Sequence, residues 1–229
     1  MPLEWKLTTI GKTGITHWKQ HNPKKLLESL SRPAILEIGK HPRVRVHEFG
    51  RLHLAVREFE PFSFRYNSGE RSFEILRELA KQRAAFVEMP VALIQRTGSN
   101  PVVITIWKKN TIGLDEFLKS GNVSDDLKER ACLNAARQTA RLHAKGFLHG
   151  HLKVENFLVD KNGNSQLVDY TLLRQEKWNL DHLKQIEIIG AIEGIVACRY
   201  PSSLNRYGEA QDALALRMKK EYVKEKQRI

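Results

Sequence analysis

The sequence predicts an α+β protein with a sheet-rich first half and a helical second half. Between residues 42 and 59, apolar and polar residues alternate with the period of two that half-buried strands show. Beyond residue 113, apolar residues instead recur every three or four positions, as on the buried face of a helix. The chain has 229 residues, 41% of them hydrophobic, so it can build a core as one domain or as two tightly apposed lobes.

The strands of the first half are predicted from short alternating runs. Residues 42–59 indicate two strands joined by a turn. Residues 91–94 and 102–107 add two more, and we expect them to complete a small antiparallel sheet of about five strands. Near the start, the pair Gly11 and Gly14 is not trailed by the Lys-Ser/Thr of a P-loop, since Ile15 and Thr16 follow the second glycine, so a plain turn is expected there.

One helix is predicted in the first half, from residue 67 to about residue 83. Asn67 and Glu70 match a capping box, in which the two side chains satisfy backbone amides at the helix start. The apolar residues that follow recur at helical spacing and would form the buried stripe. In this arrangement Ser72 falls inside the stripe and Glu70 lies on its flank.

Beyond residues 108–110, which we take as the connection between the halves, the sequence predicts four helices and a hairpin. Gly146 follows the longest helix and is expected to cap it, since glycine readily adopts the left-handed conformation. An Asn-Gly pair between two apolar runs is the strongest short-range signal for a hairpin. The predicted helices are 113–119, 124–145, 180–197 and 209–227, and the hairpin strands are 157–159 and 166–168.

Positive charge dominates the composition. With 38 Lys and Arg against 26 Asp and Glu, the formal net charge is +12. Such an excess favours polyanionic partners, namely phosphates, nucleic acid or an acidic membrane surface, and an ordinary basic surface without such a partner is the alternative. The two cysteines offer neither a disulfide framework nor metal-ligand spacing, so a reducing compartment is expected.

The start of the sequence carries no recognisable secretory signal. The first residues lack a basic region that leads into an apolar core, so a cytoplasmic location is expected. The most apolar later run, residues 186–198, is interrupted by glutamates and glycines and is too short to cross a bilayer. Any membrane contact is therefore expected to be peripheral.

The predicted hairpin carries a polar residue at each base. Asn156 enters the first strand and Asp169 leaves the second, so their oxygen atoms are expected side by side, as a hard cation requires. His151 lies five residues before Asn156, and Lys153 follows two residues after His151. This composition is typical of a nucleotide site.

Residues 149–156, with the sequence His-Gly-His-Leu-Lys-Val-Glu-Asn, resemble the catalytic loop of protein-kinase-like enzymes. In that superfamily an H-x-D-x-x-x-x-N pattern precedes a metal-binding Asp on the next hairpin strand, here Asp169. Gly150, the short chain and Arg57 make the sequence most similar to the bacterial lipopolysaccharide core kinases, the Kdo and heptose kinases. His151 stands where this family has its catalytic Asp.

The resemblance implies a two-lobed protein-kinase-like fold with ATP and Mg²⁺ between the lobes. It assigns residues 1–108 to an N-lobe made of a small antiparallel sheet and one helix. Residues 109–229 would form a short helical C-lobe that carries the catalytic-loop hairpin, residues 147–169. A C-lobe this short has no room for the peptide-binding subdomains of protein kinases, so a small-molecule or lipid-borne acceptor is expected.

The resemblance also implies roles for individual residues. Asn156 and Asp169 would bind Mg²⁺, and Lys153 would lie near the transferred phosphate. Arg57 would replace the strand lysine that holds the nucleotide phosphates, since a guanidinium can clamp phosphate oxygens with two hydrogen bonds; an exposed edge charge is the alternative. Glu70 is the candidate partner of Arg57, with an ordinary solvated first-turn acid as the alternative.

The replacement of the catalytic Asp by His151 separates two functional hypotheses. The missing carboxylate orients the acceptor hydroxyl and takes its proton; a neutral imidazole can accept that hydrogen bond but brings no negative charge. We therefore expect a pseudokinase or very weak kinase that binds ATP and Mg²⁺ and acts in envelope polysaccharide biology. The alternative is an active ATP-dependent Kdo or heptose kinase that uses His151 as its base.

Further partners follow from the charge and the histidines. The segment after Leu214 is rich in Lys and Arg, so lipopolysaccharide core or the anionic surface of the inner membrane is an expected partner. RNA binding is a weaker hypothesis, because exposed aromatic residues do not interleave with the basic ones. A zinc site from His143, His149 and His151 is also weak for want of a convincing ligand set, and His149 is expected to brace the loop.

Overall fold

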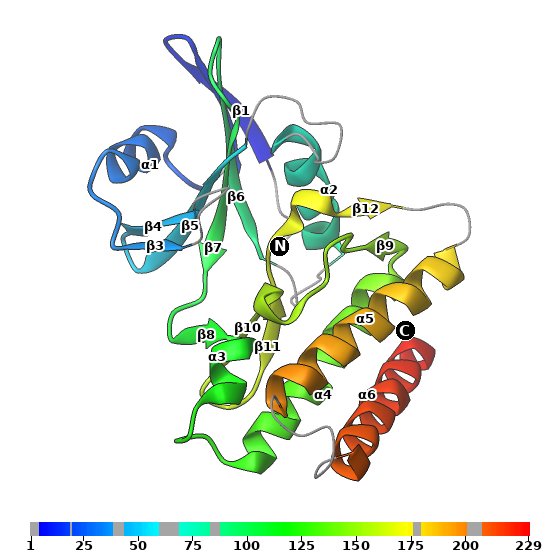
Figure 1. Ribbon diagram of the computed structural model, residues 1–229. Coiled ribbons are helices and arrows are strands. Elements are labelled where there is room, and N and C mark those ends of the chain that lie inside the picture. The colour runs from blue at the N-terminus through cyan, green and yellow to red at the C-terminus, as the bar shows by residue number, and fades with distance from the viewer. Residues whose placement is uncertain are drawn as a thin grey trace. The chain divides into compact units, whose positions relative to one another are not determined.

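The computed structural model describes residues 5–18, 20–38, 44–59, 69–82, 88–175, 180–200 and 208–229 (Figure 1). Within these residues the protein contains a seven-stranded antiparallel sheet, two smaller sheets and six α-helices. The α+β part of the predicted fold class is therefore confirmed. Contacts divide the chain into two compact units, residues 1–109 and residues 110–229.

The first unit is built on the seven-stranded sheet. Its strand order is β1-β2-β6-β7-β5-β4-β3, and neighbouring strands are antiparallel. The prediction of about five strands is wrong, because the first three strands are short or rich in threonine and show little apolar alternation. The strands are β1 (Trp5–Ile10), β2 (Thr13–Trp18), β3 (Leu36–Ile38), β4 (Val44–Phe49), β5 (Leu52–Glu58), β6 (Pro90–Arg96) and β7 (Val102–Trp107).

The first glycine of the sequence lies in a tight turn between β1 and β2. Gly11 has a φ of +59°, and Ile10 pairs with Thr13 across the turn. Positive φ is favourable for glycine at a two-residue hairpin turn. The plain turn expected here is confirmed.

Helix α1 (Pro23–Leu30) was not expected from the sequence. The Asn22 side chain accepts hydrogen bonds from the amides of Lys24 and Lys25, which would otherwise lack partners at the helix start. Pro23 lies in the first turn, where an amide hydrogen is not needed. The helix therefore begins at a sharp, sequence-encoded boundary.

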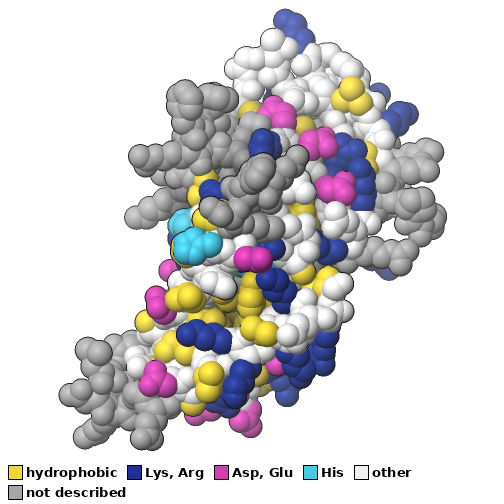
Figure 2. Space-filling model, turned by 90° about the vertical axis from the view of Figure 1, so that its right-hand side faces the viewer, with side chains coloured by type: hydrophobic (Ala, Val, Ile, Leu, Met, Phe, Trp, Pro, Cys, Tyr) yellow, Lys and Arg dark blue, Asp and Glu magenta, His cyan; other side chains and the backbone are white. Residues whose placement is uncertain are grey.

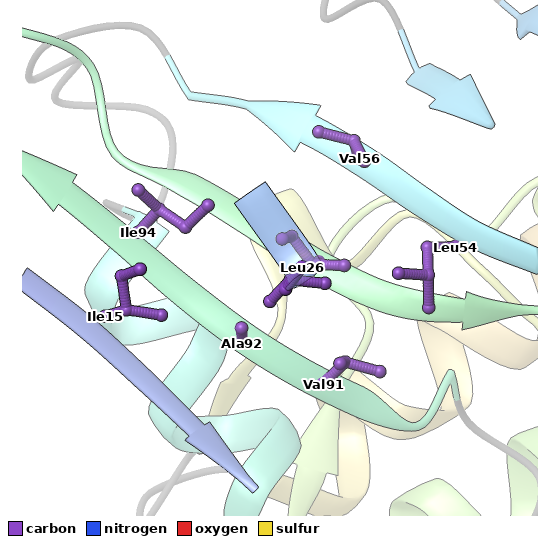
Figure 3. Packing of buried hydrophobic residues seen from close by; sticks show 8 residues of the cluster. Ile15, Leu26, Leu54, Val56, Val91, Ala92 and Ile94 are labelled. Atoms are coloured by element: carbon purple, nitrogen blue, oxygen red, sulfur yellow. The ribbon is translucent and has the colours of Figure 1, made fainter. Parts of the chain in front are cut away.

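The core of the first unit lies between α1 and one face of the sheet (Figure 3). Leu26 of α1 is fully buried and packs with Leu54 and Val56 of β5 and with Ile94 of β6. Successive side chains of a strand point to opposite faces. Arg57 consequently belongs to the face of β5 that α1 does not cover.

Helix α2 (Gly69–Lys81) packs against β6 and β7. Its buried stripe includes Phe73 and also Ser72, which is 1% exposed, while Glu70 is only half-buried. These positions confirm the predicted faces of the helix. The predicted cap, Asn67, lies outside the described residues.

The second unit is mainly helical, with two small sheets of order β11-β10-β8 and β12-β9. The predicted helices and hairpin strands are confirmed to within a few residues. Its strands are β8 (Thr111–Gly113), β9 (Phe147–Leu148), β10 (Phe157–Asp160), β11 (Ser165–Leu167) and β12 (Arg174–Gln175). Its α-helices are α3 (Leu114–Lys119), α4 (Asp125–Ala144), α5 (Leu180–Arg199) and α6 (Gly208–Arg228).

Helix α4 delivers the chain into the candidate loop. Ser124 caps its start by accepting a hydrogen bond from the amide of Leu127. Gly146, just past its end, has a φ of +82°, which confirms the predicted glycine cap. The chain then turns directly into β9 and the residues that follow it.

Among the described residues, every helix is too short or too polar to span a bilayer. On the described part of the face in Figure 2, Lys and Arg side chains are spread among hydrophobic and acidic ones rather than gathered into one patch.

Candidate functional site

The β10–β11 hairpin brings Asn156 and Asp169 to the same end of two paired strands. At the turn, Oδ1 of Asp160 accepts a hydrogen bond of 2.9 Å from the amide of Asn162. At the open end, the amide of Val168 donates to the carbonyl of Asn156 at 3.0 Å. Because Asp169 directly follows Val168, its backbone lies beside that of Asn156.

Asn156 is held by the loop that precedes it. Its side chain is buried, and Nδ2 donates a 2.7 Å hydrogen bond to the carbonyl of His151. The amide nitrogen is thus committed to the loop, and the amide oxygen is the atom that could face a cation. One side chain therefore fixes the loop backbone and offers a hard ligand.

Asp169 adopts a backbone conformation that is uncommon for residues other than glycine. Its φ of 65° and ψ of 69° lie in the left-handed region, which aspartate tolerates better than most residues. The hydroxyl of Thr171 donates to Oδ1 of Asp169 at 2.9 Å. Such conformations concentrate at functional sites, where the surrounding structure holds them.

His149 ties the loop to the strand that ends at Asp169. It is fully buried, and Nε2 donates to the carbonyl of Val168 at 2.9 Å. A carbonyl can only accept, so the proton resides on Nε2. Burial lowers the pKa of His149, and the ring is therefore neutral at physiological pH. This contact matches the bracing role expected for His149.

A largely buried carboxylate, Glu187 of α5, holds the start of the loop. Its Oε2 accepts from the amide of His149 at 3.0 Å, and its Oε1 accepts from the amide of Gly150 at 2.6 Å. Burial alone would raise the pKa of Glu187, but hydrogen bonds from His143 and these two amides outweigh burial, and the pKa is lowered. In the sequence, Glu187 stands out only as an interruption of an apolar run.

Gly150 has no room for a side chain. Its φ is +79°, and a Cβ atom at this position would lie 2.4 Å from the carbonyl oxygen of Leu172. The residue therefore allows close packing of the loop against the segment that follows Asp169. This steric requirement explains a glycine after His149 independently of any family resemblance.

The remaining loop residues of the predicted site are exposed. His151 and Lys153 both lie on the surface of the second unit. They belong to the loop whose backbone is held by hydrogen bonds to Glu187 and Asn156. The structure thus gathers His151, Lys153, Asn156 and Asp169 into one loop and hairpin. An exposed lysine in a fixed loop suits an anionic ligand.

The two predicted site residues of the first unit lie on different elements. Arg57 is half-buried on β5, between Val44 of β4 and Val103 of β7. Because β5 lies inside the sheet, the alternative of an edge charge is wrong. Glu70 lies in the first turn of α2, where its Oε1 accepts a 3.1 Å hydrogen bond from Gln95. The expected pairing of Glu70 with Arg57 remains a prediction.

A scan against protein-family models and a search of curated proteins both find no match to this chain.

The donor atoms at the hairpin fit Mg²⁺ better than a transition metal. An amide oxygen and a carboxylate oxygen are ligands that Mg²⁺ takes while keeping waters or phosphate oxygens in its remaining positions. Within the described ranges, no three His, Cys, Asp or Glu side chains cluster as a metal site would need. Any cation at Asn156 and Asp169 would therefore need ligands from a bound phosphate or from water.

Replacement of Gly150 by alanine tests the packing of the loop, and Gly146→Ala is the matched control. Both glycines have positive φ, but a Cβ at position 146 meets no atom within 4 Å. Gly146→Ala is expected to lower the free energy of unfolding by about 1–2 kcal/mol, the cost of the left-handed conformation. Gly150→Ala should cost a further ~1–3 kcal/mol for the clash with Leu172. Urea denaturation measures both; equal losses would contradict the packing described.

Proposed function

We propose that this protein is a nucleotide-binding module of the protein-kinase-like type, similar to lipopolysaccharide core sugar kinases. In this proposal it binds ATP with Mg²⁺, transfers phosphate weakly or not at all, and acts in envelope polysaccharide biology. Its two units would correspond to the two lobes of that fold. The observation that carries the proposal is the placement of Asn156 beside Asp169 at the open end of one hairpin.

Nucleotide binding is supported by the chemistry of the second unit. Asn156 and Asp169 offer oxygen ligands to Mg²⁺, which would neutralise charge on the phosphates. Lys153, exposed in the same loop, offers an ammonium group to a phosphate oxygen. Within the first unit, Arg57 of β5 carries a guanidinium that suits bidentate contact with phosphate.

Weak phosphate transfer is proposed because of His151. Its carbonyl is held by Asn156, so the residue has a defined place in the loop. A carboxylate there would orient an acceptor hydroxyl and take its proton. An uncharged imidazole can accept one hydrogen bond but does not add the negative charge that favours proton transfer.

The alternative is an active Kdo or heptose kinase in which His151 serves as the base. The exposure of His151 on the loop favours this alternative, because an exposed side chain is accessible to an acceptor. General bases contribute about 10² to 10⁴ in rate, so the two hypotheses differ by an amount that kinetic measurement resolves.

Thermal unfolding with ATP and Mg²⁺ tests the nucleotide site. At a ligand concentration a hundred times Kd, the native state should be stabilised by about 2.7 kcal/mol. Asp169→Ala should abolish the Mg²⁺-dependent part of the shift because a carboxylate ligand is lost. Glu155→Gln, which removes an exposed carboxylate of the same loop, is the control and should keep the shift. A folded parent protein that shows no shift would refute the proposal.

His151→Asp tests why transfer is weak. If the rest of the site is competent, the restored carboxylate should raise ATP turnover or phosphate transfer to a core sugar by about 10² or more. The assay is release of ADP with and without Kdo or heptose acceptors. A parent that already transfers phosphate at ordinary kinase rates, and a slower His151→Asp variant, would instead establish histidine as the working base.

An anionic membrane surface is the partner that we propose for α6. The basic segment after Leu214 is part of this helix, which docks on α4 through Arg137–Glu221 and Arg141–Glu225 contacts, both 2.6 Å. Its outward side carries Leu216 and Val223, which are 53% and 50% exposed. The exposed lysines Lys219, Lys220 and Lys224 flank them. Lysines around exposed apolar side chains favour an anionic interface.

Liposome sedimentation tests this partner with point variants, because removal of α6 would uncover the core beneath it. The triple variant K219Q/K220Q/K224Q should lose up to about 1 kcal/mol of binding per lysine on acidic vesicles. The control variant K12Q/K24Q/K25Q has the same net charge as K219Q/K220Q/K224Q but keeps the lysines of α6, so it should bind like the parent protein.

Binding should also weaken with salt, as the Debye length shrinks from about 30 Å at 0.01 M to about 8 Å at 0.15 M. Equal binding to acidic and neutral vesicles would exclude the membrane and redirect attention to nucleic acid.

A further inference from the structure

A chain of hydrogen bonds leads from the C-terminal helix to the candidate loop. On α6, the hydroxyl of Tyr222 lies 2.7 Å from Nδ1 of His143, a residue of α4. On the other side of that ring, Nε2 lies 2.7 Å from Oε2 of Glu187 on α5. Glu187 in turn holds the amides of His149 and Gly150. Side chains of α6, α4 and α5 are therefore linked in series, and the series ends at the carboxylate that holds the loop.

The linked side chains are shielded from solvent. His143 is fully buried, Tyr222 is 7% exposed, and the side chain of Glu187 is 11% exposed. Buried polar groups without partners are costly, so each member of such a chain depends on its neighbours. Loss of one hydrogen bond is therefore expected to loosen the members that remain.

Each atom in the chain has one defined role. Glu187 is ionised and can only accept, so Nε2 of His143 carries a proton and donates it. Burial lowers the pKa of His143, which keeps the ring neutral and leaves Nδ1 as an acceptor. Burial also raises the pKa of Tyr222, so its hydroxyl stays protonated and donates to Nδ1. The tautomer of His143 that donates to Glu187 is thus the same one that accepts from Tyr222.

The docking of α6 determines where Tyr222 lies. Glu221 and Glu225, one residue before and three residues after it, form 2.6 Å contacts with Arg137 and Arg141 of α4. These two pairs bracket Tyr222 along the α4–α6 interface, which is the most extensive between helices of the second unit. A shift of α6 would therefore move the hydroxyl away from His143.

We infer that α6 is a positioning element for the candidate loop, and that Tyr222 and His143 act as positioning residues through Glu187. The chain keeps the amides of His149 and Gly150 at the carboxylate, and His149 in turn holds the carbonyl next to Asp169. Only the consequence for nucleotide affinity rests on the proposed function. The coupling between α6 and the loop stands on the contacts themselves.

Amide hydrogen exchange of Tyr222→Phe tests the coupling. This variant removes one hydroxyl and leaves the ring in place, so the fold should persist. Exchange of the His149 and Gly150 amides should become about tenfold faster, the size expected from one lost hydrogen bond. Amides in the middle of α4, such as those of Ala135 and Ala136, report the change in global stability, and the loop amides should accelerate by more than they do.

Arg217→Gln is the matched control for Tyr222→Phe. It breaks another contact between α6 and α4, the exposed pair of Arg217 with Glu129, but leaves the buried chain intact. Its His149 and Gly150 amides should exchange at the parental rate. Equal acceleration in both variants, or none in Tyr222→Phe, would overturn the inference.

Two further measurements keep the inference separate from the proposed function. Imidazole ¹⁵N spectra of the parent should place the proton of His143 on Nε2, and a proton on Nδ1 would contradict the chain. Titration with ATP and Mg²⁺ should then give Tyr222→Phe a severalfold weaker affinity than Arg217→Gln. If neither parent nor variants bind nucleotide while the exchange result holds, the nucleotide site fails and the positioning role of α6 stands.

Discussion

The candidate site depends on the largely buried carboxylate of Glu187, which accepts hydrogen bonds from two backbone amides of the loop. It holds the backbone of His149 and Gly150. From there, His149 holds the carbonyl of Val168, and Asn156 holds the carbonyl of His151. These hydrogen bonds tie the loop to α5 and to the hairpin and give its backbone groups partners. Support of this kind holds a loop in one conformation.

The parts of the fold that the sequence predicted are those encoded by neighbouring residues. The hairpin followed from its Asn-Gly turn, and α4 from its apolar spacing and from Gly146 past its end. The placement of Asn156 beside Asp169 required only the hairpin. The β1–β2 hairpin and β3 were not predicted, because threonine-rich or three-residue strands have no clear periodicity.

The support of the site could not be predicted, because its partners are distant in the sequence. Glu187 lies 38 residues from His149, and Tyr222 lies 79 residues from His143. A single glutamate in an apolar helix has many possible hydrogen-bond partners. Only the packing of α4, α5 and α6 brings His143, His149 and Gly150 to Glu187. The same limit applies to Arg57 and Glu70. The local sequence predicts that the first lies on a strand and the second on a helix, but it does not predict whether their side chains pair.

Titration of the ¹⁵N-labelled protein with Mn²⁺ and ATP tests the nucleotide site most directly, because Mn²⁺ accepts the same oxygen ligands as Mg²⁺ and broadens nearby signals. With both present, the amides around Asn156 and Asp169 should broaden first, whereas Mn²⁺ alone should affect them weakly. Broadening confined to exposed carboxylates such as Asp125 and Asp126, whether or not ATP is added, would contradict a metal-nucleotide site at this hairpin.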